Sequence, residues 1–141
     1  MRIFLDANIL VSVLNKEYPL YSHTARLLSL ADHKSFTVYT SPICLAIAFY
    51  FAEKKSGTTL AKEKMKVLAT KLLIAEVNQS TVERCLANKK INDFEDGLEY
   101  YAAEKNNCSV IITEDKNDFY FSEIEVLNAK NFTEKYLLKR S

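Results

Sequence analysis

Carboxylate side chains follow two apolar segments of this chain, one at its start and one near its end. Residues 2–5 lead into Asp6, and residues 108–112 lead into a polar run that contains Asp115 and Asp118. In an open parallel sheet, ligands bind in the crevice outside the carboxyl ends of the strands. Oxygen ligands without histidine or cysteine favour Mg²⁺ or Mn²⁺. The sequence therefore predicts a divalent-metal site at this edge, where Asp115 and Asp118 compete for one position.

A third group of acids stands at the start of an expected helix. Asp93 and Asp96 are three residues apart and therefore share one helical face. Gly97 and Tyr100 continue that face, and the glycine is expected to let the helix approach the sheet edge closely. Glu95 is expected to point elsewhere. For all of these acids the structural alternative is a favourable interaction with the helix N-terminus.

The predicted acidic site would suit phosphodiester chemistry. Three or four carboxylates hold one or two divalent ions, which activate water and neutralise the charge of a phosphodiester. Neither His23 nor His33 lies near a strand end, and the sequence has no glycine-rich phosphate loop and no serine at a strand-to-helix elbow. Capping the following helix is the structural alternative for Asp6.

Length and composition are those of an ordinary folded protein. A chain of 141 residues, with 48% hydrophobic and 26% charged residues, is expected to form a single domain over residues 1–141. A net charge of +1 gives no global preference for nucleic acid. Scattered Cys44, Cys85 and Cys108 predict reduced, buried thiols. We expect no leader peptide. The longest apolar stretch, residues 43–52, has ten residues and is too short to span a membrane, so we expect a cytoplasmic protein.

Strands alternate with helices along the chain, which predicts an α/β fold with a mostly parallel sheet. Ser41-Pro42 opens a helix that ends at Gly57, and Ser80 with Glu83 predicts a capping box. The expected strands are residues 2–5, 36–40, 73–77, 108–112 and 125–127. The expected helices cover residues 7–15, 21–31 and 42–55, a segment containing residues 61–72, another containing residues 82–86, residues 92–105, and a segment from residue 129.

The order of these motifs resembles the PIN domain, and more narrowly the bacterial PIN proteins that act as toxin ribonucleases of the VapC type. The resemblance covers the whole chain and rests on four segments: residues 6–8, Ser41-Pro42, residues 93–98 and residues 111–119. It implies a three-layer α/β/α, Rossmann-like fold with about five strands. It also implies Mg²⁺- or Mn²⁺-dependent cleavage of single-stranded or structured RNA, an antitoxin protein as inhibitor, and a homodimer.

By position, the resemblance assigns three acids to the catalytic metal site: Asp6, Asp96, and one of Asp115 and Asp118. It assigns supporting roles to Asn8 and Thr113, and Asp93 becomes an extra metal ligand.

The sequence departs from the family at one position. The family has a glutamate on the helix after Ser41-Pro42, and the matching residue here is Ile47. Glu53 is the nearest carboxylate, but six residues along a helix turn it to another side. The site would then hold one ion, hold it weakly, or hold none.

Two surfaces suggest partners. Lys54, Lys55 and Lys62 lie on consecutive helices and could form a basic rim for RNA, although lysines opposite an apolar stripe are commonly a solvated face. The helix over residues 43–52 is apolar all round, so we expect it to be buried in the core or in a homodimer interface. Tyr100 and Tyr101 have base stacking as an alternative to core packing.

Three functional classes fit the sequence. The leading one is a metal-dependent endoribonuclease, the toxin of a toxin–antitoxin pair. The second is a PIN-like domain that has lost catalysis and binds RNA or protein, which Ile47 motivates. The third, a phosphotransferase with Asp6 as nucleophile, fits poorly because Asn8 stands where such enzymes need a second aspartate.

Overall fold

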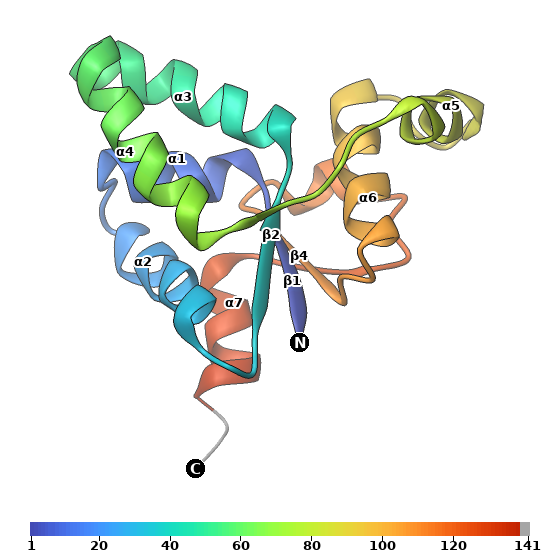
Figure 1. Cartoon of the computed structure of the whole chain (residues 1–141). Helices are drawn as coiled ribbons and strands as arrows, with labels where there is room; N and C mark the ends of the chain where they lie inside the picture. Colours follow the sequence, from blue (N-terminus) through green and yellow to red (C-terminus); the bar gives the residue numbers. More distant parts are fainter. Residues whose placement is uncertain (139–141) are drawn as a thin grey trace.

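Five parallel strands form the centre of the structure, a computed structural model that describes residues 1–138. The strands follow the order β3-β2-β1-β4-β5, so β1 lies between its two neighbours β2 and β4 (Figure 1). Their bounds are β1 (Arg2–Leu5), β2 (Thr37–Thr40), β3 (Leu73–Ile74), β4 (Val110–Ile112) and β5 (Glu125–Leu127). The chain adds β2 and β3 on one side of β1, then β4 and β5 on the other. The gap between β1 and β4 is therefore the topological switch point where α/β folds bind ligands.

Helices cover both faces of this sheet, as expected for a three-layer α/β protein. Helices α1, α2 and α7 lie on one side, with α3 and α4 next to them, whereas α5 and α6 lie on the other side (Figure 1). Their bounds are α1 (Ala7–Asn15), α2 (Tyr21–Ser29), α3 (Pro42–Ser56), α4 (Thr58–Lys71), α5 (Gln79–Ala87), α6 (Phe94–Lys105) and α7 (Ala129–Phe132). Short 3₁₀ turns follow at Leu30–Asp32 and Lys116–Phe119, and a π-helical segment at Thr133–Leu137.

The central strands are buried on both faces, which fixes the positions of the residues at their ends. Ile3, Phe4 and Leu5 in β1 are fully buried, and so are the residues of β4. The register pairs Leu5 with Ile112, and the backbone N–H of Asp6 donates to the carbonyl of Ile112 at 3.0 Å. Asp6 and Thr113 therefore leave the sheet side by side, as the sequence predicts.

The predicted ends of α3 are confirmed. Ser41 is its N-cap and accepts a hydrogen bond from the backbone N–H of Cys44, and Gly57, at φ 84°, is its C-cap. The sequence predicts a capping box that begins at Ser80, and this prediction is wrong by two residues. Asn78, not Ser80, is the N-cap, and it pairs reciprocally with Thr81. An Asn side chain fills this role as well as a Ser side chain does.

Other boundaries are shorter than the sequence suggests. The third strand contains only Leu73–Ile74 and is exposed, at 51% and 44%, although the apolar run predicts a buried strand. It lies at the edge of the sheet, where one side of each residue has no neighbouring strand. The fourth strand begins at Val110, two residues after the predicted start.

Gly97 allows a close approach, but to α5 and not to the sheet edge as predicted. A Cβ atom at this position would overlap the Sγ atom of Cys85 and lie 2.8 Å from Cγ2 of Ile91. The absence of a side chain therefore sets how closely α6 packs on α5. This contact fixes the helix whose first turn carries Asp96.

The apolar helix α3 is buried on one side only. Cys44, Ala48 and Ala52 face the core, whereas Tyr50 and Phe51 are 56% and 45% exposed. Neither α3 nor any other helix within residues 1–138 combines the length and apolar character that crossing a membrane requires.

Candidate metal-binding site

Asp6 both caps a helix and faces the cleft at the switch point. Its Oδ1 atom accepts from the backbone N–H of Ala7 at 2.6 Å, and its Oδ2 atom accepts from the Thr113 hydroxyl at 2.8 Å. The residue is 7% exposed. Asp6 therefore caps α1, which is the structural alternative, and it also lines the cleft; its role as a metal ligand stays a prediction.

Asn8 connects the two strand ends through both ends of its amide. The Nδ2 group donates to Thr113 Oγ1 at 3.1 Å and to Asp115 Oδ2 at 3.2 Å. The Oδ1 atom accepts from the backbone N–H of Glu114 at 3.2 Å. The structure thus brings Asn8 and Thr113 next to Asp6 and Asp115, and their supporting role stays a prediction.

The first turn of α6 supplies the third wall of the site. Asp96 is half-buried and lines the cleft, and Glu95 lines it as well, contrary to the expectation that Glu95 points elsewhere. Asp93 is the N-cap of α6, where its Oδ1 atom accepts from the backbone N–H of Asp96 at 3.1 Å. Asp93 is not among the residues that line the cleft, and its role as a metal ligand stays a prediction.

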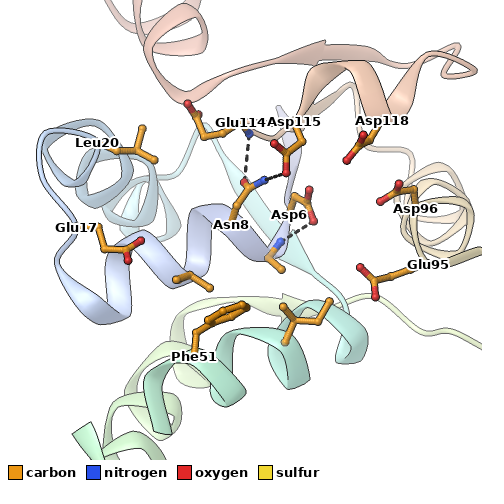
Figure 2. Close-up of a pocket in the computed structure, with 13 residues that line it drawn as sticks. Asp6, Asn8, Glu17, Leu20, Phe51, Glu95, Asp96, Glu114, Asp115 and Asp118 are labelled. Carbon is orange, nitrogen blue, oxygen red and sulfur yellow. Dashed lines mark hydrogen bonds between the residues drawn. The ribbon is translucent and has the colours of Figure 1, made fainter. Parts of the chain in front are cut away.

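These elements enclose an acidic cleft of about 510 Å³ (Figure 2). Its acidic lining residues are Asp6, Glu17, Glu95, Asp96, Glu114, Asp115 and Asp118. In Figure 2, Asp118 and Asp96 point toward one another across the cleft. The remaining lining residues include Asn8 and Leu20, and no lysine, arginine or histidine within residues 1–138 lines the cleft.

Burial and the negative charges around the cleft raise the pKa of two of its carboxyl groups. Burial, and then the charges of Asp93, Asp118, Asp6 and Glu95, raise the pKa of Asp96 to about 7. Burial, then the charges of Asp93 and Asp6, also raise the pKa of Glu95. The ion pairs within residues 1–138 do not involve these acids, so no internal cation offsets their charge.

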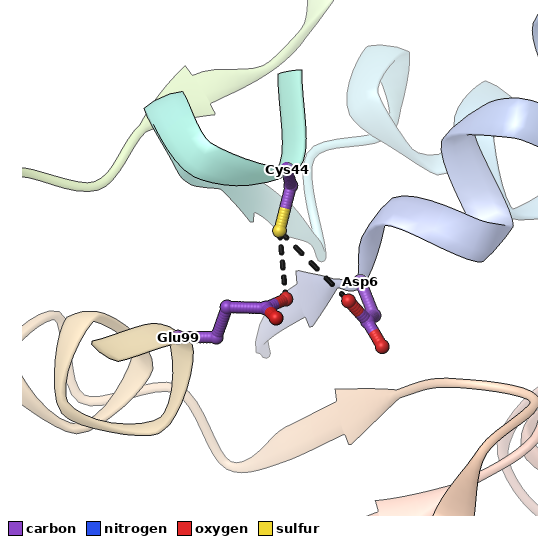
Figure 3. Close-up of side chains that lie close together, drawn as sticks. All are labelled: Asp6, Cys44 and Glu99. Carbon is purple, nitrogen blue, oxygen red and sulfur yellow. Dashed lines mark hydrogen bonds between the residues drawn. The ribbon is translucent and has the colours of Figure 1, made fainter. Parts of the chain in front are cut away.

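Sequence reasoning missed two residues beside the site, Glu99 and Cys44. Figure 3 shows their side chains next to Asp6. Glu99 is 1% exposed, and the Cys44 thiol donates to its Oε1 atom at 2.8 Å. The signal for Glu99 was available, because it lies three residues after Asp96 and thus one turn along the same face.

The wall contributed by α3 is apolar. Ile47 and Phe51 line the cleft, one helical turn apart. Glu53, the alternative carboxylate on this helix, does not line it and instead accepts from the Thr58 hydroxyl at 2.8 Å. No other residue of α3 therefore supplies the carboxylate that is missing at position 47.

The predicted basic residues lie outside the cleft. The Lys55 ammonium donates to the backbone carbonyl of Asn15 at 2.6 Å, and the Lys54 ammonium lies over the Tyr50 ring. Lys62 is exposed on α4. RNA contact by these lysines stays a prediction. Tyr100 and Tyr101 are buried, at 4% and 8%, which agrees with the core-packing alternative.

The donor set of the cleft fits a hard divalent cation. Carboxylate oxygens are the ligands that Mg²⁺ and Mn²⁺ prefer. The carboxylate of Asp118 pairs with no cationic side chain in the part of the chain that the structure describes. Asp96, whose pKa is raised by burial and by the neighbouring negative charges, is a carboxyl group whose charged form a bound cation would stabilise.

Two comparisons of the sequence find similar proteins. The sequence pattern of the PIN domain family matches residues 2–117. Ribonuclease VapC1 of Aquifex aeolicus (strain VF5) is 25% identical over 142 residues, which cover 96% of this chain and 95% of that protein.

Solved structures share the fold. VapBC2 of Rickettsia felis, bound to a DNA fragment from its promoter, has 23% identity and a TM-score of 0.65, covering 91% of this chain and 98% of that chain. Mycobacterium tuberculosis VapC20, a Sarcin-Ricin loop cleaving toxin, has 16% identity and a TM-score of 0.61. The match covers 77% of this chain and 86% of that chain. At these identities the likeness shows a common α/β architecture.

Proposed function

The chain belongs to the PIN domain family, and on that premise we propose that it is a metal-dependent endoribonuclease. The single observation that carries this proposal is the convergence of Asp6, Asp96, Asp115 and Asp118 on one cleft at the switch point of the sheet. No cationic side chain within residues 1–138 lines that cleft. We regard these four aspartates as the catalytic acids of the enzyme.

The proposed cofactor is Mg²⁺ or Mn²⁺, held by Asp6, Asp96, Asp115 and Asp118. When bound, such an ion activates water and neutralises the charge that develops on a phosphodiester. The fixed geometry of the carboxylates comes from the protein. Thr113 and Asn8 hold Asp6 and Asp115 by hydrogen bonds, and Asp93 caps the helix that positions Asp96.

The proposed substrate is single-stranded or structured RNA. The names of two similar proteins support it, a ribonuclease from Aquifex aeolicus and a toxin that cleaves the Sarcin-Ricin loop. Exposed Lys54, Lys55 and Lys62 would contact the phosphate backbone outside the cleft, because α3 extends from the cleft toward them.

We further propose that this protein is cytoplasmic, that it is the toxin of a toxin–antitoxin pair, and that it forms a homodimer. The VapBC complex of Rickettsia felis supports a protein partner. The exposed apolar side chains on the paired helices α3 and α4 are Tyr50, Phe51, Leu60 and Val67. Exposed apolar side chains on two neighbouring helices favour a surface that another chain covers.

The proposal is tested by measuring Mn²⁺ binding and RNA cleavage in parallel. We expect the wild-type protein to bind Mn²⁺ in calorimetry and to cleave a single-stranded RNA at millimolar Mn²⁺. Asp6→Asn and Asp96→Asn should lose both properties while they keep the cooperative thermal transition. If the wild-type protein neither binds Mn²⁺ nor cleaves RNA, the enzyme proposal is wrong.

A catalytically impaired PIN domain that binds RNA or protein is the second candidate. The apolar wall formed by Ile47 and Phe51 favours it, since no carboxylate reaches the cleft from α3. This candidate predicts RNA binding that is independent of Mn²⁺ and no cleavage. Asp96→Asn would then leave the affinity for RNA unchanged or would increase it by removing a negative charge.

A further inference from the structure

A buried carboxyl group lies directly behind the acidic cleft. Glu99 follows Asp96 by one turn of α6, and ligand-type oxygens of Glu95, Asp96 and Glu99 lie within 4.8 Å of one another. Glu99 also belongs to a second group with Asp6 and Cys44, whose ligand atoms lie within 4.8 Å as well. Glu99 thus connects the acid at the end of β1 with the acids at the start of α6.

The surroundings of Glu99 are unusual for a glutamate that has only a structural role. Fully buried glutamates are rare unless they are paired, and Glu99 is 1% exposed. Its side chain contacts the Cys44 thiol and the carboxyl group of Asp6. No ion pair within residues 1–138 includes it. Two buried carboxyl groups in contact are costly when both are charged, and either a proton held between them or a bound cation relieves that cost.

Helix α3 holds this glutamate in place from the opposite side. The Ser41 hydroxyl donates to Sγ of Cys44 at 3.2 Å, and the thiol donates to Oε1 of Glu99 at 2.8 Å. All three side chains are buried. Ser41, Cys44 and Glu99 therefore form a buried chain of hydrogen bonds that holds Oε1 of Glu99 in place.

We propose that Glu99 is a further metal-holding carboxylate of this centre, together with Asp6 and Asp96, and that Cys44 is its positioning residue. The inference rests on the proposed function, because it presupposes a divalent cation in the cleft. Glu99 would supply from α6 the carboxylate that the apolar wall of α3 lacks.

The test compares Mn²⁺ affinity by calorimetry in the wild-type protein and in Glu99→Gln, which keeps the size of the side chain and removes its charge. We expect the affinity to fall by about tenfold to a hundredfold or more. The matched control is Glu104→Gln on the same helix, where Glu104 pairs with Arg84 away from the cleft. Wild-type affinity in Glu99→Gln would overturn the proposal.

A second pair of variants separates metal binding from folding. Glu99→Asp keeps the charge but shortens its reach by one methylene, so we expect weaker Mn²⁺ binding even if Glu99→Gln fails to fold. Adding Ile47→Glu to Glu99→Gln returns a carboxylate to the cleft and should restore part of the affinity. Wild-type binding by Glu99→Asp, or no recovery in the folded double variant, would contradict the assignment.

The positioning role of Cys44 is tested by replacing its thiol, which donates to Glu99. Cys44→Ser keeps an X–H group and should bind Mn²⁺ nearly as the wild-type protein does, whereas Cys44→Ala should still unfold cooperatively but bind Mn²⁺ more weakly. Equal affinity in both variants would remove the positioning role. If the wild-type protein binds no Mn²⁺, the proposed function fails; if only Asp6→Asn and Asp96→Asn lose binding, the inference about Glu99 alone fails.

Discussion

The hydroxyl of Thr113 donates its hydrogen to Asp6, because two other donors already occupy both lone pairs of the hydroxyl oxygen. The amide of Asn8 and the backbone N–H of Asp115 donate to Thr113 Oγ1 at 3.1 and 3.0 Å. A hydroxyl has one hydrogen and two lone pairs, so its hydrogen is directed to Asp6 Oδ2 at 2.8 Å. This single atom therefore fixes the distance between the acids that follow β1 and β4.

Replacing Thr113 with valine should destabilise the protein and weaken the site together. The change leaves the buried Asp6 oxygen without its donor, which costs about 1–3 kcal/mol of unfolding free energy. Chemical denaturation measures this loss, and calorimetry should show weaker Mn²⁺ binding. Thr113→Ser keeps the hydroxyl and should retain most of both properties. A valine variant as stable as the wild-type protein would show that the hydrogen bond contributes little.

The raised pKa of Asp96 predicts a pH dependence of stability without metal. With a folded pKa of about 7, against about 4 for an unperturbed aspartate, the folded state holds a proton that the unfolded state releases. The contribution of Asp96 to stability is therefore complete below about pH 4 and is lost as the pH rises to about 7. Denaturation in EDTA at stepped pH measures it.

The comparison with Asp96→Asn isolates that contribution from other titrating groups. The wild-type protein should lose stability relative to the variant as the pH rises from about 4 to about 7. A difference that does not change with pH would contradict the raised pKa. In the same range, the Mn²⁺ affinity of the wild-type protein should increase, because the cation competes with the proton on Asp96.

Asp118 and Asp115 should differ in their effect on Asp96. The charge of Asp118 helps to raise the pKa of Asp96, whereas the charge of Asp115 is not among the causes. The Oδ2 atom of Asp115 already accepts a hydrogen bond from Asn8. Asp118→Asn should therefore lower the pKa of Asp96 more than Asp115→Asn does. Carbon-detected NMR titration of the carboxyl groups measures both shifts. Equal shifts would indicate that the two aspartates occupy equivalent positions.

Gly97→Ala should destabilise the protein although alanine is the better helix former. Alanine gains about 1 kcal/mol from helix propensity, but overpacking in a dense core costs about 1–3 kcal/mol. The added Cβ would overlap Sγ of Cys85 and lie 2.8 Å from Ile91. We expect a net loss of up to about 2 kcal/mol, measured by thermal or chemical denaturation.

The double variant Gly97→Ala/Cys85→Ala provides the control. Removing Sγ opens space for the new methyl group, so the loss in the double variant should be smaller than the sum of the two single losses. Strictly additive losses would show that contact with Cys85 is not what excludes a side chain at position 97.

The strand ends were predictable because they depend on local patterns. The short apolar runs before Asp6 and Thr113 predict buried parallel strands, and neighbouring parallel strands end at the same edge. The caps at Ser41 and Gly57 follow from backbone geometry and were predicted for the same reason. These rules need no knowledge of which helix packs against which.

The details that the sequence did not predict depend on packing between distant segments. The sequence does not predict the burial of Glu99, because a glutamate in the middle of a helix usually faces solvent. Its burial requires Cys44 from α3, which lies 55 residues away in the chain. The exposure of Leu73 likewise follows from the place of β3 at the sheet edge, which an apolar run cannot show.

The central position of β1 has a consequence for the synthesis of the protein. The hydrogen bond between Asp6 and Thr113 joins residues 107 positions apart, and β1 meets β4 only when that second strand exists. A ribosome releases the chain from its N-terminus, so Asp6 emerges first and Asp118 among the last of the acids. A nascent chain therefore lacks the complete acidic cleft, and the proposed cleavage of RNA should begin only after most of the polypeptide has been translated.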